Sequence, residues 1–581
     1  MDNAATPQPE SADMSASDPQ LPGQLAKLNQ SIDPFGIGAS LAKVAEGWVT
    51  NPAKLATAYA DLARDLQGML LHSWQAASGL QPPPAVKAAP DDTRFADPAW
   101  SEQPTYSLLK QSYLLYTHWL QEALFETPGV PAKERRRATF WVRQWLNAVA
   151  PTNFLFTNPV ALRKFSESGG QSVAAGLKLW LDDLRVGDVQ MVDRTAFKVG
   201  GNLATTPGAV VYRNELMELI QYAPTTDEVH TLPIVIFPPW INKYYILDLN
   251  EKKSLLRYLV SQGYTVFVVS WKNPTAAQSE TTFDDYLLKG MSQAIEVARA
   301  ICQAPRVHAV GYCIGGTALA ALMAWFNREF RDASAVPVAH WTLLASLVDF
   351  SRPGGIEVFI DEETVDTLDK MMEKQGYLDG REMGRAFRLL RSNSLIWHYF
   401  VHNYLYGEIP PPFDVLYWNT DGTRMPRAMH SFYLRELYVH NKLIKKDELE
   451  IAGHPIDLAR IRQPLYAVGC EEDHIAPWKA TFEIVGKITA PVRYTLSSSG
   501  HILGIINPPV KPPKRSYWSG ETNSDTASEW HKHQQKVEGS WWENWAAWLA
   551  EPCGPLVPAR PPGSADYPVL CAAPGTYVQE I

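Results

Sequence analysis

The segment from Arg306 to Leu319, RVHAVGYCIGGTAL, constrains the fold of this chain more than any other stretch. It consists of a strand-like run, the spacing G-x-C-x-G at Gly311, Cys313 and Gly315, and the start of a helix-like run. In a nucleophile elbow, the turn between strand and helix is so tight that the positions flanking the nucleophile must lack side chains. The turn raises the nucleophile at the helix N-terminus, where free N–H groups stabilise negative charge. The pattern therefore predicts a nucleophilic Cys313; the alternative is a small buried cysteine in a glycine turn.

Short β-rich apolar runs appear from about residue 205 onward and alternate with helical segments. Six such runs lie at 232–237, 264–271, 306–310, 341–350, 463–469 and 491–496. Helical patterns at 253–263 and 283–302 lie between the first three runs. Strand–helix alternation of this kind predicts a mostly parallel sheet covered by helices. Together with the elbow, it predicts an α/β-hydrolase fold for residues 205–581.

Three other parts of the chain have a different character. Residues at about 351–460 separate the fourth run from the fifth, and an insertion of this size between core strands is commonly a lid or cap. Residues 26–204 have a mainly helical pattern, which predicts a helical N-terminal domain. Within it, FWVRQWLNAVAP places apolar side chains at i, i+3, i+4 and i+7, and Pro151 ends the run. Residues 1–25 are expected to form a disordered tail.

Composition and cysteine usage exclude several classes of protein. The formal net charge is −9 and no basic stretch is interleaved with aromatic residues, so we do not expect nucleic acid as a partner. The five cysteines form no CxxC pair and are odd in number, which argues against a disulfide framework or a zinc site and favours a reducing compartment. The N-terminus does not resemble a signal peptide, and without a run of about 18 apolar residues we expect no transmembrane helix. Neither a GxGxxG fingerprint nor a Walker loop appears, and we expect no metal site and no cofactor.

Tryptophan is abundant near the C-terminus. Four of the 20 tryptophans fall in one segment, SWWENWAAWLA, at positions 541, 542, 545 and 548. One interpretation is a helix that docks its tryptophan-rich side on the core. The other is contact with a hydrophobic surface or a partner.

An elbow cysteine needs a base and an acid, and in this architecture the acid precedes the histidine along the chain. Asp473 lies in the acidic loop CEEDHIAPW after the fifth run, and His501 lies in SSSGHILGIINPP after the last one. We therefore expect Asp473 and His501 to be the acid and the base. The chain has 14 histidines, and His474 and His308 are alternatives, although His308 lies in the strand before the elbow, where a structural role is expected. Asp349, at the end of the fourth run, is the alternative acid.

Two backbone N–H groups are expected to form an oxyanion hole. One belongs to the residue after the nucleophile, which is Ile314. The second normally comes from the loop after an early strand, here FPPWINKYYILDL, and by analogy we expect the N–H of Ile241.

A cysteine in place of the usual serine favours a thioester substrate. A cysteine that attacks a thioester makes another thioester, so the exchange is nearly balanced in energy and the product stays activated toward an alcohol. A thiol beside a histidine at a helix N-terminus also ionises with less help than a hydroxyl. The sequence thus favours an enzyme that takes an acyl group from acyl-CoA and passes it to a hydroxyl, with a lid that keeps water out.

Seven sequence blocks resemble the class I polyhydroxyalkanoate synthases, bacterial enzymes that polymerise (R)-3-hydroxyacyl-CoA into a storage polyester. The resemblance runs over about 100–581 and rests on RQWLNAVAPTNFLFTNP, GGNLATTPGAVVYRNELMELIQY, PPWINKYYILDL, VVSWKNP, GYCIGGTALA, EEDHIAPW and SSGHILGIINPP. It implies short-chain monomers such as 3-hydroxybutyryl-CoA. It also implies Cys313 as the nucleophile, His501 as the general base, and an Asp473 that orients the histidine or helps to activate the hydroxyl.

The same resemblance implies partners and a location. Such synthases act as homodimers, bind the surface of the growing polyester granule in the cytoplasm and cover the active site with a cap. CoA is released as part of the substrate, so it is not a cofactor. The helical N-terminal region is linked to granule attachment and dimer stability. Trp418, in LYWNTDGTR, is expected in the cap without an assigned role.

Three other functions fit parts of the pattern. An intracellular polyhydroxyalkanoate depolymerase would use a similar cysteine on the same polyester in reverse, but the long N-terminal region and the matching blocks argue against it. A generic esterase is disfavoured because thiols are unusual there. A granule-coating protein without activity would explain the helical and tryptophan-rich segments but not an intact triad. CoA release separates synthase from depolymerase, and Cys313→Ala separates an enzyme from a coat.

Overall fold

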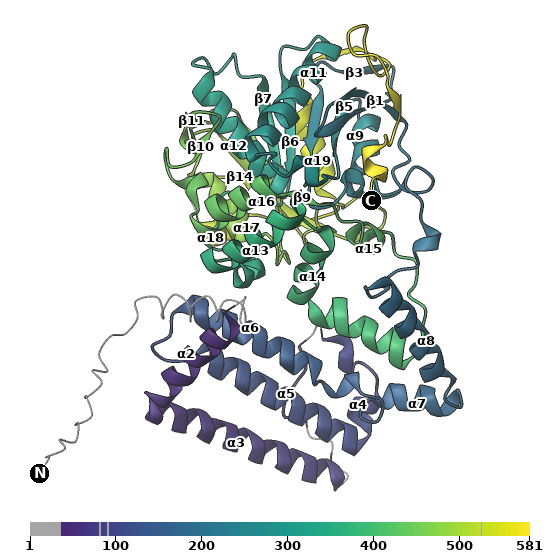
Figure 1. Cartoon of the computed structure of the whole chain (residues 1–581), viewed down its shortest axis with the longest axis vertical. Coiled ribbons are helices and arrows are strands. Elements are labelled where there is room, and N and C mark those ends of the chain that lie inside the picture. Colours follow the sequence, from purple (N-terminus) through teal and green to yellow (C-terminus); the bar gives the residue numbers. More distant parts are fainter. Residues whose placement is uncertain (1–35, 79, 81–82, 90–91, 524–525) are drawn as a thin grey trace, which may run out of the picture.

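The computed structural model describes residues 36–78, 80, 83–89, 92–523 and 526–581, and the tail expected at 1–25 lies outside these ranges. Figure 1 shows a layer of helices and, above it, a larger part built around a sheet. No helix in the described ranges is long and apolar enough to span a bilayer.

The helical layer contains seven α-helices among the described residues. They are α2 (Ile37–Val49), α3 (Pro52–Ala77), α4 (Ala99–Glu102), α5 (Pro104–Phe125), α6 (Ala132–Ala148), α7 (Pro159–Glu167) and α8 (Gln171–Val186). Local sequence explains the start of α7: the Asn158 side chain accepts the N–H groups of Val160 and Ala161, and Pro159 occupies the first turn. The helix expected around FWVRQWLNAVAP is α6, in which Leu146 is buried while Trp145 is 56% exposed.

The larger part contains an eleven-stranded sheet in the order β15-β14-β13-β12-β7-β6-β4-β5-β2-β1-β17. The strands are β1 (Gly208–Arg213), β2 (Met217–Tyr222), β4 (Ile234–Phe237), β5 (Val266–Trp271), β6 (Val307–Tyr312), β7 (Val338–Leu344), β12 (Leu465–Cys470), β13 (Val492–Ser497), β14 (Ser516–Glu521), β15 (Val537–Glu538) and β17 (Cys571–Ala572). The six strands from β5 to β13 pair in parallel, and the flanking pairs are antiparallel. Strands β5, β6 and β12 are buried throughout, as expected for strands covered on both faces. This order, with the elbow after β6, confirms the α/β-hydrolase fold.

All six expected runs form parallel strands, but one is shorter than its apolar sequence. The run at 341–350 leaves the sheet after Leu344 because Ala345 adopts a positive φ of 46°. The N–H of Ala345 donates to the carbonyl of Val468 at 2.7 Å, which closes the end of the ladder against β12. The chain then turns away from the sheet toward the cap.

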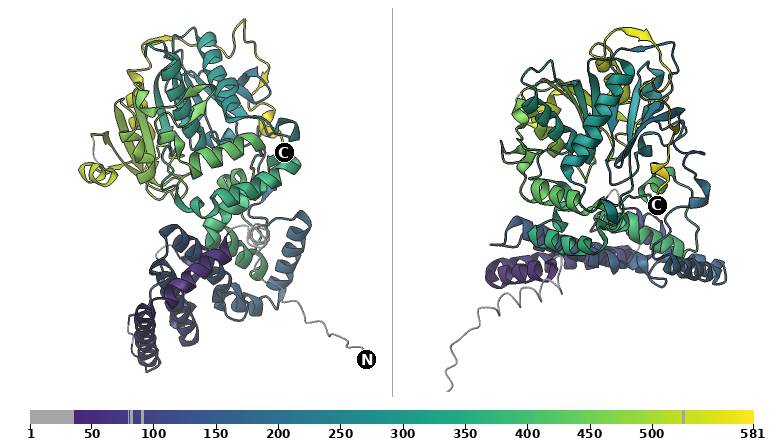
Figure 2. Two further views of the ribbon diagram at one scale, coloured as in Figure 1. Left: turned by 60° about the vertical axis from the view of Figure 1, so that its left-hand side comes forward. Right: turned by 45° about the horizontal axis from the view of Figure 1, so that its top comes forward.

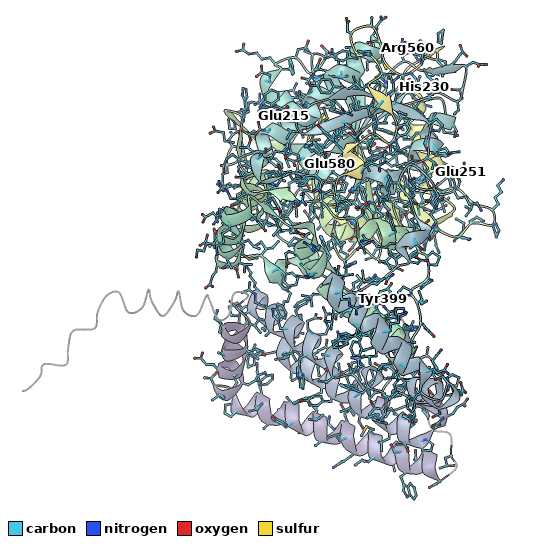
Figure 3. All side chains as sticks on the ribbon, turned by 45° about the vertical axis from the view of Figure 1, so that its right-hand side comes forward. Glu215, His230, Glu251, Tyr399, Arg560 and Glu580 are labelled. Atoms are coloured by element: carbon cyan, nitrogen blue, oxygen red, sulfur yellow. The ribbon has the colours of Figure 1, made fainter. Side chains whose placement is uncertain are left out.

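The cap fills the interval between β7 and β12. It contains η7 (Gly354–Phe359), α13 (Glu362–Gln375), α14 (Gly380–Leu390), η8 (Asn393–Trp397), η9 (Phe400–Leu405), α15 (Asp414–Asn419), α16 (Arg427–Phe432) and η10 (Tyr433–Val439). The last three elements lie near the end of the sheet that carries the elbow, and η8 and η9 reach toward the helical layer. Figures 1 and 2 show the cap between the sheet and the helical layer. Tyr399 of the cap, labelled in Figure 3, lies where the cap meets the helical layer.

The helical layer docks on the cap through apolar packing, a close backbone approach and ion pairs such as Arg136–Glu357 and Lys164–Glu408. Phe140 of α6 packs with Ile356, Val358 and Phe359 of η7 in a small apolar cluster. Helix α8 approaches η9 so closely that a Cβ on Gly176 would lie 2.0 Å from the Tyr404 carbonyl oxygen. A side chain at Gly176 would therefore force the two elements apart.

The tryptophan-rich C-terminal segment forms α19 (Trp541–Ala550). Trp541, Trp542 and Trp545 are buried in the main core, and Trp548 packs against it. The indole N–H groups of Trp541 and Trp542 donate to the carbonyls of Gly504 and Ile505, just after His501. The core-docking interpretation is therefore correct for Trp541, Trp542 and Trp545, whose buried side chains are not available to a partner.

Candidate active site

Cys313 lies between β6 and α12 (Ile314–Glu329) with φ 54° and ψ −126°, a conformation that a residue with a side chain rarely adopts. The flanking glycines are required by space. A Cβ on Gly311 would lie 2.4 Å from the Cα of Gly316, and a Cβ on Gly315 would lie 2.3 Å from the Phe237 carbonyl oxygen. The N–H of Cys313 donates to Leu344 at 2.8 Å, which anchors the turn on β7. The segment thus has the predicted elbow geometry.

His501 and Asp473 lie together although 28 positions separate them along the chain. The Nδ1 atom of His501 is 2.6 Å from Oδ2 of Asp473. The other carboxylate oxygen accepts the N–H groups of Ile475 and Ala476, both at 2.8 Å. The imidazole stacks on Tyr312, whose hydroxyl donates to the His501 carbonyl at 3.2 Å. These contacts fix the ring and leave Nε2 as the nitrogen that can take a proton.

The electrostatics of His501 connect it to Cys313. Burial by itself lowers the pKa of this imidazole, because a buried cation loses its hydration. The negative charges of Asp473 and of the Cys313 thiolate, with a hydrogen bond to each, outweigh burial and hold the pKa of His501 well above its ordinary value. The arrangement therefore favours an imidazole that binds a proton readily, as a general base beside a cysteine nucleophile must.

The two alternative bases do not take the place of His501. His308 is buried at the opposite end of β6, where its Nδ1 is 2.5 Å from Nδ1 of His340 and its Nε2 is 3.0 Å from the Thr342 hydroxyl. Burial lowers the pKa of His308 well below its ordinary value. Burial, together with the charge of Arg391, lowers the pKa of His474 to about 4. Neither histidine bonds to Asp473 in the part of the chain that the structure describes.

The alternative acid is engaged in a different contact. Asp349 accepts hydrogen bonds from the Asn441 amide at 2.9 Å and from the N–H of Ser351 at 2.8 Å. The ammonium of Lys487 lies 3.9 Å from it. The structure therefore brings Asp473, and not Asp349, to the imidazole.

The two expected oxyanion donors lie on segments that meet at the elbow. Ile314 is the first residue of α12, and Ile241 follows β4 in the loop at 238–243. The start of this loop lies close to Gly315. A Cβ on Gly315 would be 2.3 Å from the Phe237 carbonyl oxygen and 2.8 Å from the Pro238 carbonyl oxygen. Within the described ranges, the N–H groups of Ile314 and Ile241 donate to no protein acceptor. Both N–H groups therefore stay candidates for the oxyanion hole.

Sequence reasoning missed an aromatic cover that the cap contributes. Burial raises the pKa of Tyr433 and of Tyr438 in η10, and the charge of Cys313 adds to the rise in each pKa. The Tyr433 ring lies 6.3 Å from Trp240, and the Tyr438 ring lies 4.6 Å from Phe350. Neither spacing nor periodicity shows which turn of a long insertion will face the elbow.

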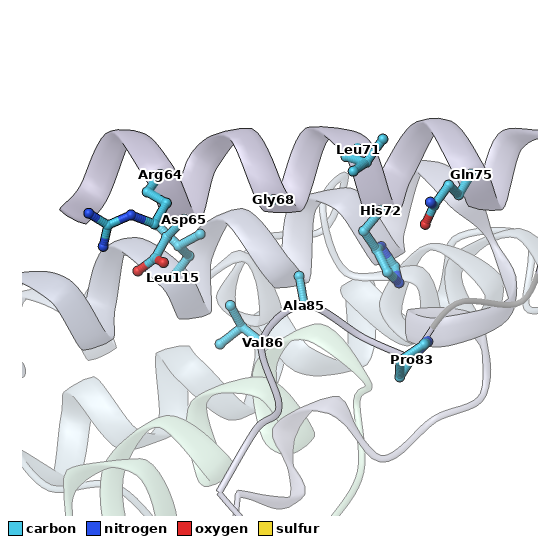
Figure 4. A pocket seen from close by; sticks show the side chains of 10 residues that line it. All are labelled: Arg64, Asp65, Gly68, Leu71, His72, Gln75, Pro83, Ala85, Val86 and Leu115. Carbon is cyan, nitrogen blue, oxygen red and sulfur yellow. The ribbon is translucent and has the colours of Figure 1, made fainter. Parts of the chain in front are cut away.

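A cavity of about 460 Å³ lies in the helical layer, away from these residues. It is lined by α3, α5 and the segment after α3, including Arg64, Asp65, His72 and Gln75 (Figure 4). No group of three or more His, Cys, Asp or Glu side chains in the described ranges is arranged to hold a metal ion. The candidate site is thus the set around Cys313.

Comparison with known proteins places the chain in one family. Residues 91–259 match the family described as Poly-beta-hydroxybutyrate polymerase (PhaC) N-terminus. Among solved structures, the chain is similar to a monoacylglycerol lipase of Paleococcus ferrophilus, with 11% identity and a TM-score of 0.30 over 58% of this chain and 99% of that one.

Curated relatives match over most of their length. A poly(3-hydroxyalkanoate) polymerase of Methylorubrum extorquens is 40% identical over 96% of this chain and 92% of that protein. A polymerase subunit of Cupriavidus necator is 41% identical over 84% of this chain and 83% of that protein. A polymerase subunit of Rhizobium etli is 37% identical over 95% of this chain and 87% of that protein. The chain therefore belongs to the poly(3-hydroxyalkanoate) polymerase family.

Proposed function

We propose that this chain polymerises (R)-3-hydroxyacyl-CoA, with short-chain monomers such as 3-hydroxybutyryl-CoA, into polyhydroxyalkanoate and releases CoA. The observation that carries the proposal is the elbow thiol of Cys313 beside a His501 that is itself bonded to Asp473. The names of the curated relatives support the polymerase over the depolymerase alternative. A thiol is also the nucleophile that keeps the transferred acyl group activated.

The first step forms an acyl-enzyme. His501 takes the proton of Cys313, and the thiolate attacks the thioester carbonyl of the substrate. The N–H groups of Ile314 and Ile241 stabilise the oxyanion of the tetrahedral intermediate. The intermediate collapses with cleavage of the bond to the CoA sulfur, and CoA leaves with the proton from His501. A new thioester on Cys313 remains.

The second step extends the polyester. His501 removes the proton from the hydroxyl at the end of the growing chain, and the alkoxide attacks an acyl thioester. The bond to sulfur breaks as the ester forms, and the thiolate takes back the proton held by His501. Water would compete with the hydroxyl for the thioester, and the aromatic cover of Tyr433 and Tyr438, which packs on Trp240, limits the access of water. The bond from Asp473 to Nδ1 supports an orienting role for the carboxylate, which holds the ring with Nε2 toward the reacting groups.

The helical layer supports binding to a granule surface. In α8, Leu177, Trp180, Leu181 and Leu184 recur with helical spacing and are 53%, 42%, 43% and 58% exposed. We call these four residues the α8 stripe. Gly176 and Asp183 mark the buried side of the same helix, which packs on η9, and the four side chains of the stripe lie beside it on the exposed surface. Such a row of large apolar side chains suits contact with a hydrophobic polyester surface. The homodimer and the cytoplasmic location remain predictions.

The test is CoA release from (R)-3-hydroxybutyryl-CoA by the full chain, beside Cys313→Ala. We expect turnover with insoluble polymer from the natural chain and none from the variant, because the acyl-enzyme cannot form. Cleavage of preformed polyester without CoA release would instead favour the depolymerase. If neither the natural chain nor Cys313→Ala releases CoA but both bind granules, the result would favour a granule-coating protein without activity.

A further inference from the structure

The loop at 238–243, which carries Ile241, is held from outside by a segment of the cap. We call residues 418–423 the clasp. The N–H of Thr423 donates to the carbonyl of Ile241 at 2.9 Å, and its hydroxyl donates to the carbonyl of Trp240. Asn242 and Gly422 form an isolated antiparallel bridge. The loop and the clasp therefore run side by side as a short two-stranded contact.

Side chains reinforce this contact at the end of the loop. The indole N–H of Trp418 donates to the carbonyl of Lys243 at 2.6 Å. The buried ammonium of Lys243 pairs with Asp421 of the clasp at 2.9 Å and donates to the Glu580 carbonyl at 2.9 Å. Figure 3 labels Glu580, which belongs to the C-terminal segment. This buried cation resists movement, because separation from Asp421 leaves its charge uncompensated and separation from the Glu580 carbonyl leaves a buried donor unpaired.

The Thr423 hydroxyl acts on the one peptide unit that matters for the oxyanion. The carbonyl of Trp240 and the N–H of Ile241 belong to the same planar trans peptide and point in opposite directions. A donor that fixes the carbonyl therefore fixes the direction of the N–H. Thr423 is 3% exposed and Trp240 is 1% exposed, so rotation of this peptide would leave a buried hydroxyl and a buried carbonyl unpaired.

The other side of the loop is fixed by the elbow and the sheet. The Phe237 and Pro238 carbonyls occupy the space where a side chain on Gly315 would lie. The Trp271 indole N–H donates to the Pro238 carbonyl at 2.9 Å. The loop thus starts on the nucleophile's own turn and ends on the cap. Its central peptide, between Trp240 and Ile241, is the part whose direction depends on the clasp.

We propose that Thr423 is a positioning residue that holds the Ile241 N–H toward the reacting carbonyl, so that oxyanion stabilisation requires a seated cap. The inference rests on the proposed function, because it takes Ile241 as an oxyanion donor. A cap displaced from the loop frees the peptide to rotate and slows acyl transfer without altering the thiol. Closure of the cap and assembly of the oxyanion hole are then one event.

The experiment compares Thr423→Val with Thr423→Ser in the full chain. Valine keeps the shape and removes the hydroxyl, whereas serine keeps the donor. We expect the kcat for CoA release to fall about tenfold or more in Thr423→Val, with little change in KM, because loss of an entire oxyanion donor costs about 10²–10³-fold. Thr423→Ser should retain most of the natural rate.

Alkylation of Cys313 by iodoacetamide separates positioning from damage to the fold. That displacement builds no oxyanion on a carbonyl, so Thr423→Val should alkylate at the natural rate. Equal slowing of alkylation and acyl transfer would show that Thr423 supports the thiol or the fold, and would overturn the proposal. An unchanged kcat in Thr423→Val would overturn it as well.

Replacement of Ile241 by its α-hydroxy acid analogue separates two statements: that Thr423 positions the peptide, and that the Ile241 N–H is an oxyanion donor. The resulting ester replaces the N–H by an oxygen, and it also makes the Trp240 carbonyl a weaker acceptor for Thr423. We expect it to slow acyl transfer, and Thr423→Val in addition should slow it little further. If acyl transfer is slow in the ester variant but fast in Thr423→Val, the Ile241 N–H is an oxyanion donor but Thr423 does not position it. A fast ester variant would reject Ile241 as a donor, and the inference with it, while turnover through Cys313 would stand.

Discussion

At the residue scale, the site depends on one strained backbone and one buried pair. Cys313 has φ 54° although it carries a side chain, a strain of about 1–3 kcal/mol that persists only where the surroundings enforce it. The enforcing contacts are Gly311 against Gly316 and the hydrogen bond from Cys313 to Leu344. The result is a thiol presented to His501, whose positive form Asp473 stabilises.

The contribution of Asp473 can be measured through the pH dependence of the thiol. Asp473→Asn removes a negative charge that raises the pKa of His501, so that pKa falls and the imidazole binds the proton of the thiol less readily. We expect the midpoint of the iodoacetamide alkylation profile, which reports the coupled pair, to move to higher pH. We also expect kcat for CoA release to fall by roughly 10³–10⁴-fold, since the amide favours the wrong tautomer.

Asp349→Asn is the matched control for that substitution. It changes the alternative acid, which bonds to Asn441 and Ser351 and not to the imidazole. Its alkylation profile and its kcat should equal those of the natural chain. The same shift in both variants, or no shift in Asp473→Asn, would contradict the assignment of the acid.

At the scale of elements, the closeness of α12 to the loop after β4 decides whether the site assembles. Gly315 lies on the first turn of α12 where the Phe237 carbonyl leaves no space for a side chain. The two proposed oxyanion donors, Ile314 and Ile241, come from these two elements. Separation of α12 from the loop would therefore disturb the oxyanion hole without removing any reacting group.

Gly315→Ala tests that closeness. The added Cβ would lie 2.3 Å from a backbone oxygen that cannot move as a side-chain end can. We expect a loss of about 1–3 kcal/mol in the free energy of unfolding, from denaturant titration, and a fall in kcat of more than tenfold. Gly486→Ala is the control, since a Cβ there meets nothing within 4 Å. A comparable loss of stability and kcat in both variants would mean that the added Cβ at Gly315 does not act through its clash with the Phe237 carbonyl.

Local patterns and long-range docking explain what the sequence could and could not predict. The elbow, Asp473 and His501 follow from spacing and strand order, because a parallel sheet places the ends of its strands at one edge. Thr423 and Tyr433 could not be found this way, since their roles depend on how the cap folds back over the elbow. The antiparallel strands at both sides of the sheet lack the strand–helix alternation on which the prediction relied.

At the scale of the whole molecule, the cap connects two surfaces of different chemistry. On one side it covers the thiol, and on the other it carries the helical layer through η7 and η9. Most of the large apolar side chains that are exposed in the described ranges belong to this layer, including Trp145 of α6 and the α8 stripe. A layer that binds polyester would thus hold the cap, and the site beneath it, close to the growing polymer.

The α8 stripe allows binding to polyester to be separated from catalysis. The paired change Leu181→Glu with Leu184→Lys keeps net charge constant and replaces two exposed apolar side chains. Burial of each leucine is worth about 1.5–3 kcal/mol, so the fraction of protein that sediments with purified granules should fall about tenfold or more. The initial rate of CoA release from soluble substrate should not change, because the stripe touches neither the elbow nor the clasp.

The control for the stripe carries the same kind of change on the other part of the molecule. Val569 and Leu570 are 52% and 49% exposed near β17, so Val569→Glu with Leu570→Lys removes a similar apolar area. It should leave sedimentation with granules unchanged if the helical layer is the binding surface. Equal loss in both double variants would indicate binding through general surface hydrophobicity, and loss only in the control would place the polyester on the sheet side. A fall in the soluble rate of the stripe variant would show that the helical layer acts on the site through the cap.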